Sequence, residues 1–190
     1  MSIVIFIIAI IVILLCYKVY SDKQWHKKPL QNFPFIHKGK VFWYSRSVAT
    51  TIGVFCYDND GNLNVLANKR GEGTPDYQGY WNIVCGYLEH GVNAEENCQK
   101  EVFEETGLFV PLDKIQFHSL NTKPDENKQN VSLRYVSLLD GICDDYELSL
   151  DNCESNEVEK VMWIPVNDVG NYVWAFNHNE LIGKMIEKIK

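Results

Sequence analysis

The chain is poor in arginine and, beyond its first forty residues, poor in positive charge of any kind. Arg46, Arg70 and Arg134 are the only arginines among 190 residues. Residues 1–40 hold six lysines and one aspartate, which leaves 12 basic and 24 acidic residues for the remainder. Binding to a nucleic-acid polymer depends on neutralising phosphates, so this balance excludes general binding of that kind. It suits a small phosphate ligand that arrives with its own metal ion.

The six cysteines form no C-x-x-C pair and no cluster with histidine, which excludes the usual zinc-binding patterns. Scattered single cysteines fit a reducing compartment and packing roles better than disulfide pairing. Internal repeats and low-complexity tracts are also missing. With 46% apolar and 13% aromatic residues the chain can bury a core, and its length predicts one domain with an appendage.

Charge and proline are both absent from residues 3–17, IVIFIIAIIVILLCY. With its flanks this run covers about 20 residues, which is enough to span a hydrocarbon core. A signal peptide is the alternative, but its basic leader and small-x-small cleavage site are missing. We therefore predict a single-pass transmembrane helix over residues 1–20, through which the membrane is a partner.

Positive charge follows this predicted span. Six lysines lie between residues 18 and 40, and by the positive-inside rule they predict that the rest of the chain faces the cytoplasm. Contact with anionic headgroups is a second role open to these lysines. We predict a basic juxtamembrane tether over residues 21–40 and a folded domain over residues 41–190.

The predicted domain alternates strands with a few helices. A β-rich run, a turn at residues 58–61 and a second run predict a hairpin. Strands on both sides of one acidic helix predict a mixed α/β (α+β) fold, with a mixed sheet and helices on its faces. The expected strands are Val48–Tyr57, Leu63–Ala67, Trp81–Val84, Ile115–Leu120, Val131–Leu139 and Val161–Ile164, and the expected closing helix is His178–Lys190.

The acidic helix carries three carboxylates, Glu101, Glu104 and Glu105, on adjoining turns. At about 100° per residue they fan over an arc of roughly 100°, and their mutual repulsion destabilises the helix. A divalent cation such as Mg²⁺, which takes oxygen ligands, would remove that cost. The alternative is a solvated helix face. Asn93 and Glu96 form a capping box before the helix, and Gly107 is a natural stop.

Residues 86–108, GYLEHGVNAEENCQKEVFEETGL, resemble the Nudix box, G-x5-E-x7-R-E-U-x-E-E-x-G-U, in which U is bulky and apolar. Two positions depart from the pattern. Val92 stands where the pattern has Glu, and Lys100 stands where it has Arg, so the bidentate fork of Arg is lost. The matching positions are Gly86, Glu101, Val102, Glu104, Glu105, Gly107 and Leu108.

The resemblance implies a Nudix-type α/β/α sandwich that hydrolyses the pyrophosphate bond of a small nucleoside diphosphate derivative with Mg²⁺ or, alternatively, Mn²⁺. It implies catalytic and metal-binding roles for Glu101, Glu104 and Glu105, with the backbone carbonyl of Cys85 completing the metal shell. Glu157 resembles the later acidic residue of the family, which is a ligand or the general base; a surface residue is the alternative. The choice of base lies between Glu157 and Glu101.

Substrate contacts are predicted from residue type. Arginine suits bidentate contact with phosphate, so Arg70, Arg134 and Arg46 are candidates, with a surface role as the alternative. Trp81, together with Tyr80 and Tyr77, could stack on a nucleobase, although aromatic side chains in such places more often pack.

Three functions remain open. The first is the hydrolase, acting on a nucleoside triphosphate, ADP-ribose, a nucleotide sugar or a similar compound. The second is a catalytically weak or inactive Nudix domain that serves as a membrane-anchored nucleotide sensor, which Val92 and Lys100 favour. The third is a structural membrane adaptor. A homodimer is also left open.

Overall fold

The structure, a computed structural model, describes residues 33–123, 130–153 and 156–189. The chain divides into two compact units, the second of which spans Ser47–Lys190. In the first unit, β1 (Phe33–His37) and β2 (Lys40–Tyr44) form an antiparallel hairpin. Part of the segment that we predicted as a tether is therefore a β-hairpin. The domain boundary at residue 41 stays a prediction.

The predicted membrane location requires correction. Among the residues that the structure describes, no helix combines the length and the apolar character that a membrane crossing needs. In this described part of the chain the α-helices are α2 (Ala94–Thr106) and α3 (His178–Ile189), with 13 and 12 residues, fewer than the roughly 20 that a span requires. Residues 1–20, predicted as an anchor, lie outside the described residues. The single-pass location with a cytoplasmic domain is contradicted, and we withdraw it.

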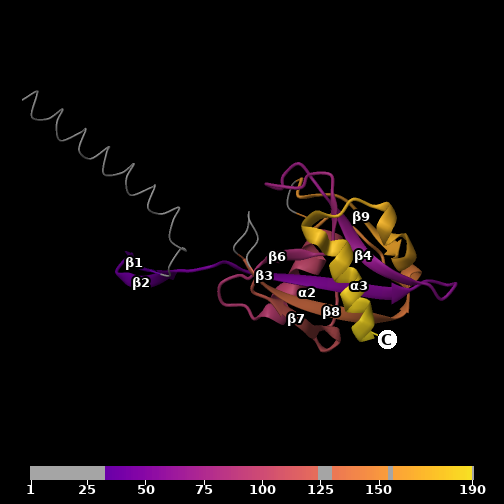
Figure 1. The fold of residues 1–190 in the computed structure, drawn as a ribbon, viewed down its shortest axis with the longest axis horizontal. Helices are drawn as coiled ribbons and strands as arrows, with labels where there is room; N and C mark the ends of the chain where they lie inside the picture. Colours follow the sequence, from indigo (N-terminus) through magenta and orange to yellow (C-terminus); the bar gives the residue numbers. More distant parts are fainter. Residues whose placement is uncertain (1–32, 124–129, 154–155, 190) are drawn as a thin grey trace, which may run out of the picture. The chain divides into compact units, whose positions relative to one another are not determined.

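The second unit is built on one mixed, seven-stranded sheet (Figure 1). Strand order is β5-β4-β3-β8-β7, with β6 paired to β3 and β9 paired to β4. β3 and β8 run parallel, and the other pairs are antiparallel. The strands are β3 (Val48–Tyr57), β4 (Leu63–Arg70), β5 (Trp81–Asn82), β6 (Cys85–Tyr87), β7 (Gln116–Asn121), β8 (Val131–Ile142) and β9 (Val158–Pro165). The predicted mixed sheet is confirmed.

Four short 3-10 helices complete the described elements. They are η1 (Leu112–Lys114), η2 (Cys143–Asp145), η3 (Val166–Asn171) and η4 (Ala175–Asn177). The last of these leads directly into α3, which lies across one face of the sheet in Figure 1.

Side-chain alternation along β3 divides the interior into two cores. Ile52, Val54 and Cys56 pack in one core with Cys98 and Val102 of α2. Phe55 points the other way and packs in a core with Leu181, Ile182 and Met185 of α3. Because successive residues of a strand face opposite sides of a sheet, α2 and α3 cover opposite faces. The three layers of the predicted sandwich follow from this alternation.

Candidate active site

Helix α2 begins and ends where its sequence signals predict. The Asn93 side chain accepts a hydrogen bond from the Glu96 backbone N–H at 2.8 Å, and Glu96 accepts one from the Asn93 N–H at 3.3 Å. At the other end Gly107 adopts the left-handed conformation, with φ 73°, which glycine tolerates without strain. These caps fix where the helix starts and ends, and therefore the direction in which the three glutamate side chains project from it.

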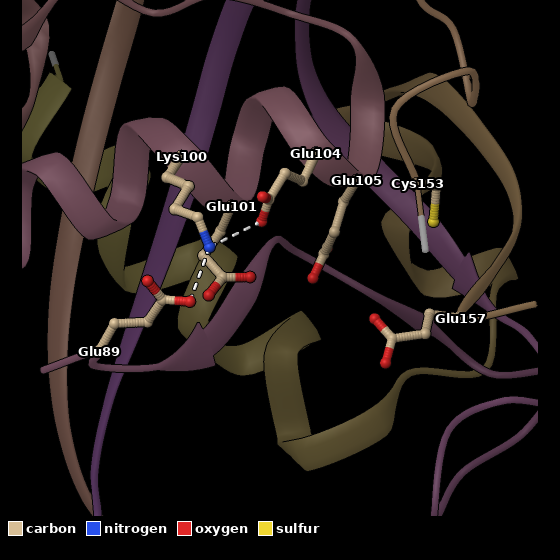
Figure 2. A pocket seen from close by; sticks show the side chains of 7 residues that line it. All are labelled: Glu89, Lys100, Glu101, Glu104, Glu105, Cys153 and Glu157. Atoms are coloured by element: carbon tan, nitrogen blue, oxygen red, sulfur yellow. Dashed lines mark hydrogen bonds and ion pairs between the residues drawn. The ribbon is translucent and has the colours of Figure 1, made fainter. Parts of the chain in front are cut away.

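Four glutamates predicted for the site line one open cavity of about 170 Å³ (Figure 2). Glu101, Glu104 and Glu105 project from α2, and Glu157 approaches from the start of β9. The remaining lining residues are Glu89, Lys100 and Cys153. Sequence reasoning missed Glu89 and Cys153 as lining residues. The only sequence signal for Glu89 was its place in the loop between Gly86 and Gly91.

The two inner carboxyls of α2 lie in an environment that disfavours their charge. Burial raises the pKa of Glu101 to about 7, and the charge of Glu104 adds to the shift. Burial also raises the pKa of Glu105 well above its ordinary value, and the charge of Glu101 adds to it. Desolvation and like charges both favour the neutral carboxyl. A cation bound in the cavity would reverse both effects.

Neighbouring strands hold these carboxyls in place. Asn68 of β4 donates a hydrogen bond from Nδ2 to Glu105 Oε2. Asn97 donates to Glu101 Oε1 at 3.5 Å and to Thr50 Oγ1 at 2.9 Å, which ties the helix to β3. Gly86 lies so close that a Cβ built on it would overlap the Glu101 carboxylate. The opening glycine of the predicted box therefore permits β6 to approach α2.

Lys100 joins the preceding loop to the helix. Its ammonium lies 2.7 Å from Glu89 Oε1 and 3.2 Å from Glu104 Oε2. The Glu89 backbone N–H donates to Asn97 Oδ1 at 3.0 Å, so the loop is attached to α2 at two points. Although Lys100 departs from the box pattern, it still pairs with carboxylates on both sides of the cavity rim.

Glu157 is positioned through its backbone. Its carbonyl accepts a hydrogen bond from the Gly71 N–H at 2.8 Å, and the Asn156 carbonyl accepts one from the Gly73 N–H at 2.7 Å. A Cβ on Gly71 would overlap the Asn156 carbonyl oxygen. The loop that follows β4 thus supports the acidic residue on the far side of the cavity from α2.

The donor set suits a hard divalent cation. The carboxylates of the cavity supply oxygen ligands, the kind that Mg²⁺ and Mn²⁺ prefer. Within residues 33–123, 130–153 and 156–189, no three His, Cys, Asp or Glu side chains already stand close enough together to hold an ion. The chemistry of the residues fits a metal, and the individual ligand roles stay predictions.

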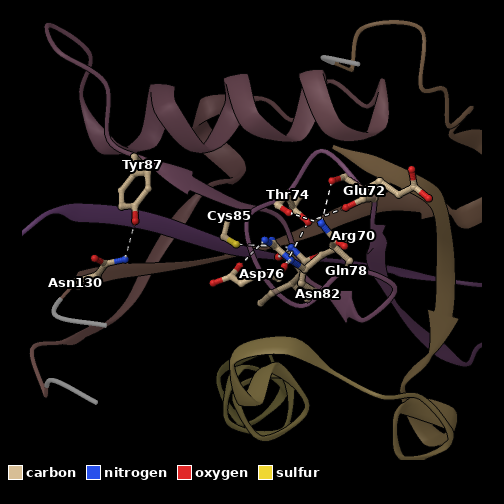
Figure 3. A network of polar contacts seen from close by, with 11 residues as sticks. Arg70, Glu72, Thr74, Asp76, Gln78, Asn82, Cys85, Tyr87 and Asn130 are labelled. Carbon is tan, nitrogen blue, oxygen red and sulfur yellow. Dashed lines mark hydrogen bonds and ion pairs between the residues drawn. The ribbon is translucent and has the colours of Figure 1, made fainter. Parts of the chain in front are cut away.

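Arg70 is not among the residues that line the cavity; Figure 3 shows it within a network of polar contacts. Its Nε donates to the Asp76 carbonyl at 2.9 Å, and its Nη2 lies 2.8 Å from Asp76 Oδ1. The guanidinium also stacks 5.0 Å from the Phe176 ring centroid. Burial raises the pKa of the Cys85 thiol to about 12; the charge of Glu105 raises it further and that of Arg70 opposes this. Arg70 therefore acts on the same region as the inner glutamates.

Trp81 and Arg134 are not among the residues that line the cavity; the burial of Trp81 disagrees with its predicted stacking role, and phosphate contact by Arg134 stays a prediction. Trp81 is buried in the core under α3 and meets Tyr172 edge to face at 5.4 Å, so it packs rather than stacking on a base. Arg134 precedes Tyr135, which belongs to the α2 core, and therefore shares the α3 face with Val136. The predicted glutamates approach from the other face.

Arg46 is the last residue of the first compact unit. Its contact with phosphate stays a prediction.

Comparison with known proteins agrees with this geometry. The family model described as the NUDIX domain matches residues 48–188. Nudix hydrolase 2 of Arabidopsis thaliana is 25% identical over 164 residues, which cover 80% of this chain and 56% of the relative. The chain thus spans little more than half the length of that curated relative.

Solved structures share the fold. The NUDIX domain of Shewanella oneidensis NrtR, complexed with ADP ribose, superposes with a TM-score of 0.64 at 21% identity. The match covers 77% of this chain and 90% of the Shewanella chain. A bifunctional NMN adenylyltransferase/ADP ribose pyrophosphatase of Francisella tularensis, complexed with AMP and a Mn ion, superposes with a TM-score of 0.63 at 16% identity. The match covers 92% of this chain and 47% of the Francisella chain. At such identities the likeness concerns the fold.

Proposed function

This chain belongs to the NUDIX domain family, and from that premise we propose that it is a pyrophosphohydrolase acting on a small nucleoside diphosphate derivative. The observation that carries the proposal is that Glu101, Glu104, Glu105 and Glu157 line the same cavity. In the reaction, water adds to one phosphorus of the diphosphate and the P–O–P bridge breaks. The bridging oxygen leaves with the other phosphoryl group, and the two hydrogens of the water are released as protons to the extent that the two phosphate products ionise at neutral pH.

The glutamates of α2 would hold Mg²⁺ or Mn²⁺ in this cavity, with the Cys85 carbonyl as a further ligand. A bound cation screens the charge of the diphosphate and lowers the pKa of a coordinated water. Asn68 and Asn97 keep the two inner carboxyls oriented toward the cavity. Preorganised ligands lose little freedom when the substrate arrives, which supports a catalytic rather than a surface role.

Two carboxylates compete for the role of general base. Glu101 has a pKa of about 7 through burial and the charge of Glu104, which suits proton transfer near neutral pH. Glu157 stands on the other side of the cavity and is exposed to solvent. Their Gln variants separate the roles: loss of the base should remove the acidic limb of the pH–rate profile, whereas loss of a ligand should raise the metal concentration needed for half-maximal rate.

The substrate class follows from charge and from the relatives. The cavity is acidic, so a free diphosphate would be repelled, whereas a diphosphate that arrives with its cation is not. The Shewanella domain is complexed with ADP ribose, and the Francisella protein is an ADP ribose pyrophosphatase complexed with AMP and a Mn ion. These neighbours support a nucleoside diphosphate joined to a sugar as the first compound to test. A homodimer stays a prediction.

The test is a turnover screen of the purified chain with Mg²⁺ or Mn²⁺ against nucleoside triphosphates, nucleotide sugars and ADP-ribose, with products resolved by ³¹P NMR. We expect cleavage of at least one diphosphate, and loss of that activity in the double variant E104Q/E105Q. Circular dichroism and the melting temperature should show that the variant is folded. Undiminished turnover in the folded double variant would remove the assigned roles.

A nucleotide sensor is the second candidate function. Lys100 lines the cavity and already pairs with Glu89 and Glu104, and Val92 replaces an acidic residue of the box. Nucleotide binding that needs Mg²⁺ but yields no product over long incubation would favour this function. If the two departures are its cause, the double variant V92E/K100R should gain cleavage.

A further inference from the structure

Arg134 of β8 is a partly buried cation without a counterion. Its Nε atom is buried and makes no hydrogen bond, and none of the ion pairs among the described residues includes it. Burial lowers the pKa of Arg134, and no neighbouring charge opposes that shift. A charge that is removed from water costs free energy unless it is paired and hydrogen-bonded. A bound anion would supply the missing partner, and the side chain is exposed enough for solvent to reach it.

The sheet face that carries Arg134 changes from apolar to polar along β8. Val136 and Leu138 belong to the apolar core under α3. Because successive side chains of a strand alternate between the two faces, the same face continues from Val136 through Arg134 to Ser132, near the start of the strand. Both Arg134 and Ser132 are partly exposed. The polar end of this face therefore begins where the packing of α3 on β8 ends.

Hydroxyl groups on the neighbouring strands flank Arg134. Thr51 of β3 is its parallel partner, and Ser119 of β7 is its antiparallel partner. Paired residues point to the same face, and neighbouring strands lie about 4.8 Å apart. Thr51 Oγ1 and Ser132 Oγ lie 3.3 Å apart. Only one of these two hydroxyls can donate to the other, so the second keeps a proton that it can donate to a ligand.

Helix α3 holds the Ser119 side of this polar face through His118. His118 Nδ1 lies 2.8 Å from Ser119 Oγ, and His118 Nε2 lies 3.2 Å from the Lys184 carbonyl oxygen. A carbonyl oxygen only accepts, so Nε2 carries a proton, and with a neutral ring Nδ1 accepts the proton of Ser119. The β7 edge is thus fixed before a ligand arrives, and binding there loses little conformational entropy.

We propose that Arg134, Thr51 and Ser132 bind a phosphate group on this face of the sheet, outside the acidic cavity. A phosphate pairs with a guanidinium through two oxygens and still has oxygens that accept from a hydroxyl. It therefore supplies both the counterion and the acceptors that these groups lack. None of the three residues lines the cavity, and the glutamates of α2 belong to the opposite face of the sheet. The site is thus separate from the place of diphosphate cleavage.

The direct test is a titration of the full chain with inorganic phosphate in EDTA, followed by calorimetry and by ³¹P line width. Without a metal ion the acidic cavity repels phosphate, so the signal reports the Arg134 site. Loss of a charge-assisted pair should weaken binding about tenfold in R134Q, and R134K, which lacks the fork, should lie between. K160Q removes an exposed charge from β9 and should keep the native affinity. Equal affinity in R134Q and K160Q, or no phosphate binding by the native chain, would overturn the site.

The melting temperature separates a ligand role of Arg134 from a structural role. Arg134→Gln removes a desolvated charge that has no partner, so the variant should melt at or above the native temperature in phosphate-free buffer. Phosphate should then raise the melting temperature of the native chain but not that of the variant. If the variant melts below the native chain by the same margin with and without phosphate, Arg134 is a structural residue and the site is overturned.

Ser132→Ala tests the site without removing a charge. Loss of one hydroxyl should weaken phosphate binding about fivefold. Ser137 is the matched control, because it lies on the same strand but, by alternation, on the opposite face, and its buried hydroxyl has no hydrogen-bond partner. S137A should keep the native phosphate affinity. Equal phosphate affinity in S132A and S137A would remove the hydroxyl from the site and contradict the proposed geometry.

Ribose 5-phosphate distinguishes the two sources of a phosphate group. Tighter binding of this ester than of inorganic phosphate would make a phosphorylated compound the ligand, and equal or weaker binding would make free phosphate the ligand. Both results support the site as long as Arg134→Gln weakens the binding of each compound about tenfold. Binding of both compounds that does not depend on Arg134 would overturn it. These measurements need no turnover, so their outcome is independent of the hydrolase proposal.

Discussion

The two helices that cover the sheet are of nearly equal length but differ in what they bury. Helix α3 buries Leu181, Ile182 and Met185, together with His178. Helix α2 buries Cys98 and Val102, and its other two buried residues, Asn97 and Thr106, are polar. Burial of apolar side chains is the main favourable contribution to folding. The α3 face therefore supplies more stability per helix than the α2 face.

The buried carboxylates of helix α2 lower the stability of the folded protein when they are ionised. Glu101 and Glu105 both have raised pKa values, because burial and neighbouring carboxylates oppose their ionisation. On the other face Gly53 leaves room for Met185, since a Cβ there would overlap its sulfur, so α3 packs closely on β3. The α3 side of the sheet thus holds a closely packed apolar helix, and the α2 side holds the buried carboxylates. This division can be tested one helix at a time.

The largest effect should come from Glu105→Gln on α2. Removing one charged ligand from a diphosphate-cleaving site should lower kcat about a thousandfold. The amide of Gln can still accept the hydrogen bond from Asn68 and carries no buried charge, so we expect the melting temperature in EDTA to be equal or higher. Steady-state kinetics and calorimetry measure the two quantities.

Glu187→Gln on α3 is the control for that variant. Glu187 is exposed, and its substitution by Gln removes the same charge from the other helix. This variant should change neither kcat nor the melting temperature appreciably. A comparable fall in kcat in both variants would mean that net charge, and not the position of Glu105, governs the rate.

The next largest effect should be on stability and come from Met185→Ala on α3. Met185 is fully buried in the core under the helix, and truncating it should cost about 2–5 kcal/mol of unfolding free energy. Urea unfolding measures this, with Glu187→Ala as the exposed control within about 0.5 kcal/mol. Turnover per folded molecule should stay within about twofold, because no cavity residue lies on α3. A large fall in kcat would contradict the division between the faces.

Local signals in the sequence predicted the element that matters most for function. The caps of α2, Asn93 and Gly107, act on their nearest neighbours, so they can be identified without knowledge of the fold. Alternation along β3 and β8 likewise depends only on adjacent residues. The mixed sheet and both helices were therefore predictable from local signals, whereas the place of Glu157 beside the α2 glutamates was expected only from the family resemblance.

Residue roles that depend on distant pairing were not predictable. Alternation shows that Arg134 and Tyr135 face opposite sides of β8, but only the parallel pairing of Arg134 with Thr51 shows which side each faces. Trp81 is buried because β5 bridges to Trp174, about ninety residues later in the chain. Tyr77 and Phe176 meet across a similar separation. No local pattern distinguishes such residues from surface aromatics.

A smaller effect should appear when pH is varied on the metal-free protein. The pKa of Glu101 rises from 4.5 to about 7 through burial and then the charge of Glu104. The unfolded chain ionises first, so stability is greatest below about pH 4.5 for this group and is lost as pH rises toward 7. With partial solvent screening the loss is about 1–2 kcal/mol. Burial likewise raises the pKa of Glu105 well above its ordinary value, so this group loses stability in the same direction as pH rises.

Calorimetry in EDTA between pH 5 and 8 measures this dependence, and Glu101→Gln should flatten it. Saturating Mg²⁺ should remove most of the loss, because a bound cation favours the ionised carboxylates. A stability that is constant from pH 5 to 8 in EDTA would mean that α2 carries no charge penalty and does not differ from α3 in this respect.

The smallest effect concerns Lys100, the cation within the lining of the cavity. It pairs with Glu89 at 2.7 Å and Glu104 at 3.2 Å, and partly exposed pairs contribute little, so Lys100→Gln should lower the unfolding free energy by about 1 kcal/mol. Lys114→Gln, which breaks the pair with Asp140 on the protein surface, should cost less. High salt should reduce the difference, since it screens exposed charges.

The dependence of this stability loss on Mg²⁺ distinguishes two roles for Lys100 in the cavity. If its ammonium mainly offsets repulsion among the α2 glutamates, then Lys100→Gln should lose less stability in Mg²⁺ than in EDTA, because the metal supplies the same compensation. If it mainly fixes the loop through Glu89, the loss should be the same in both conditions. Urea unfolding of the variant with and without Mg²⁺ separates the two, and equal losses would assign Lys100 to the scaffold, with the residues of α3.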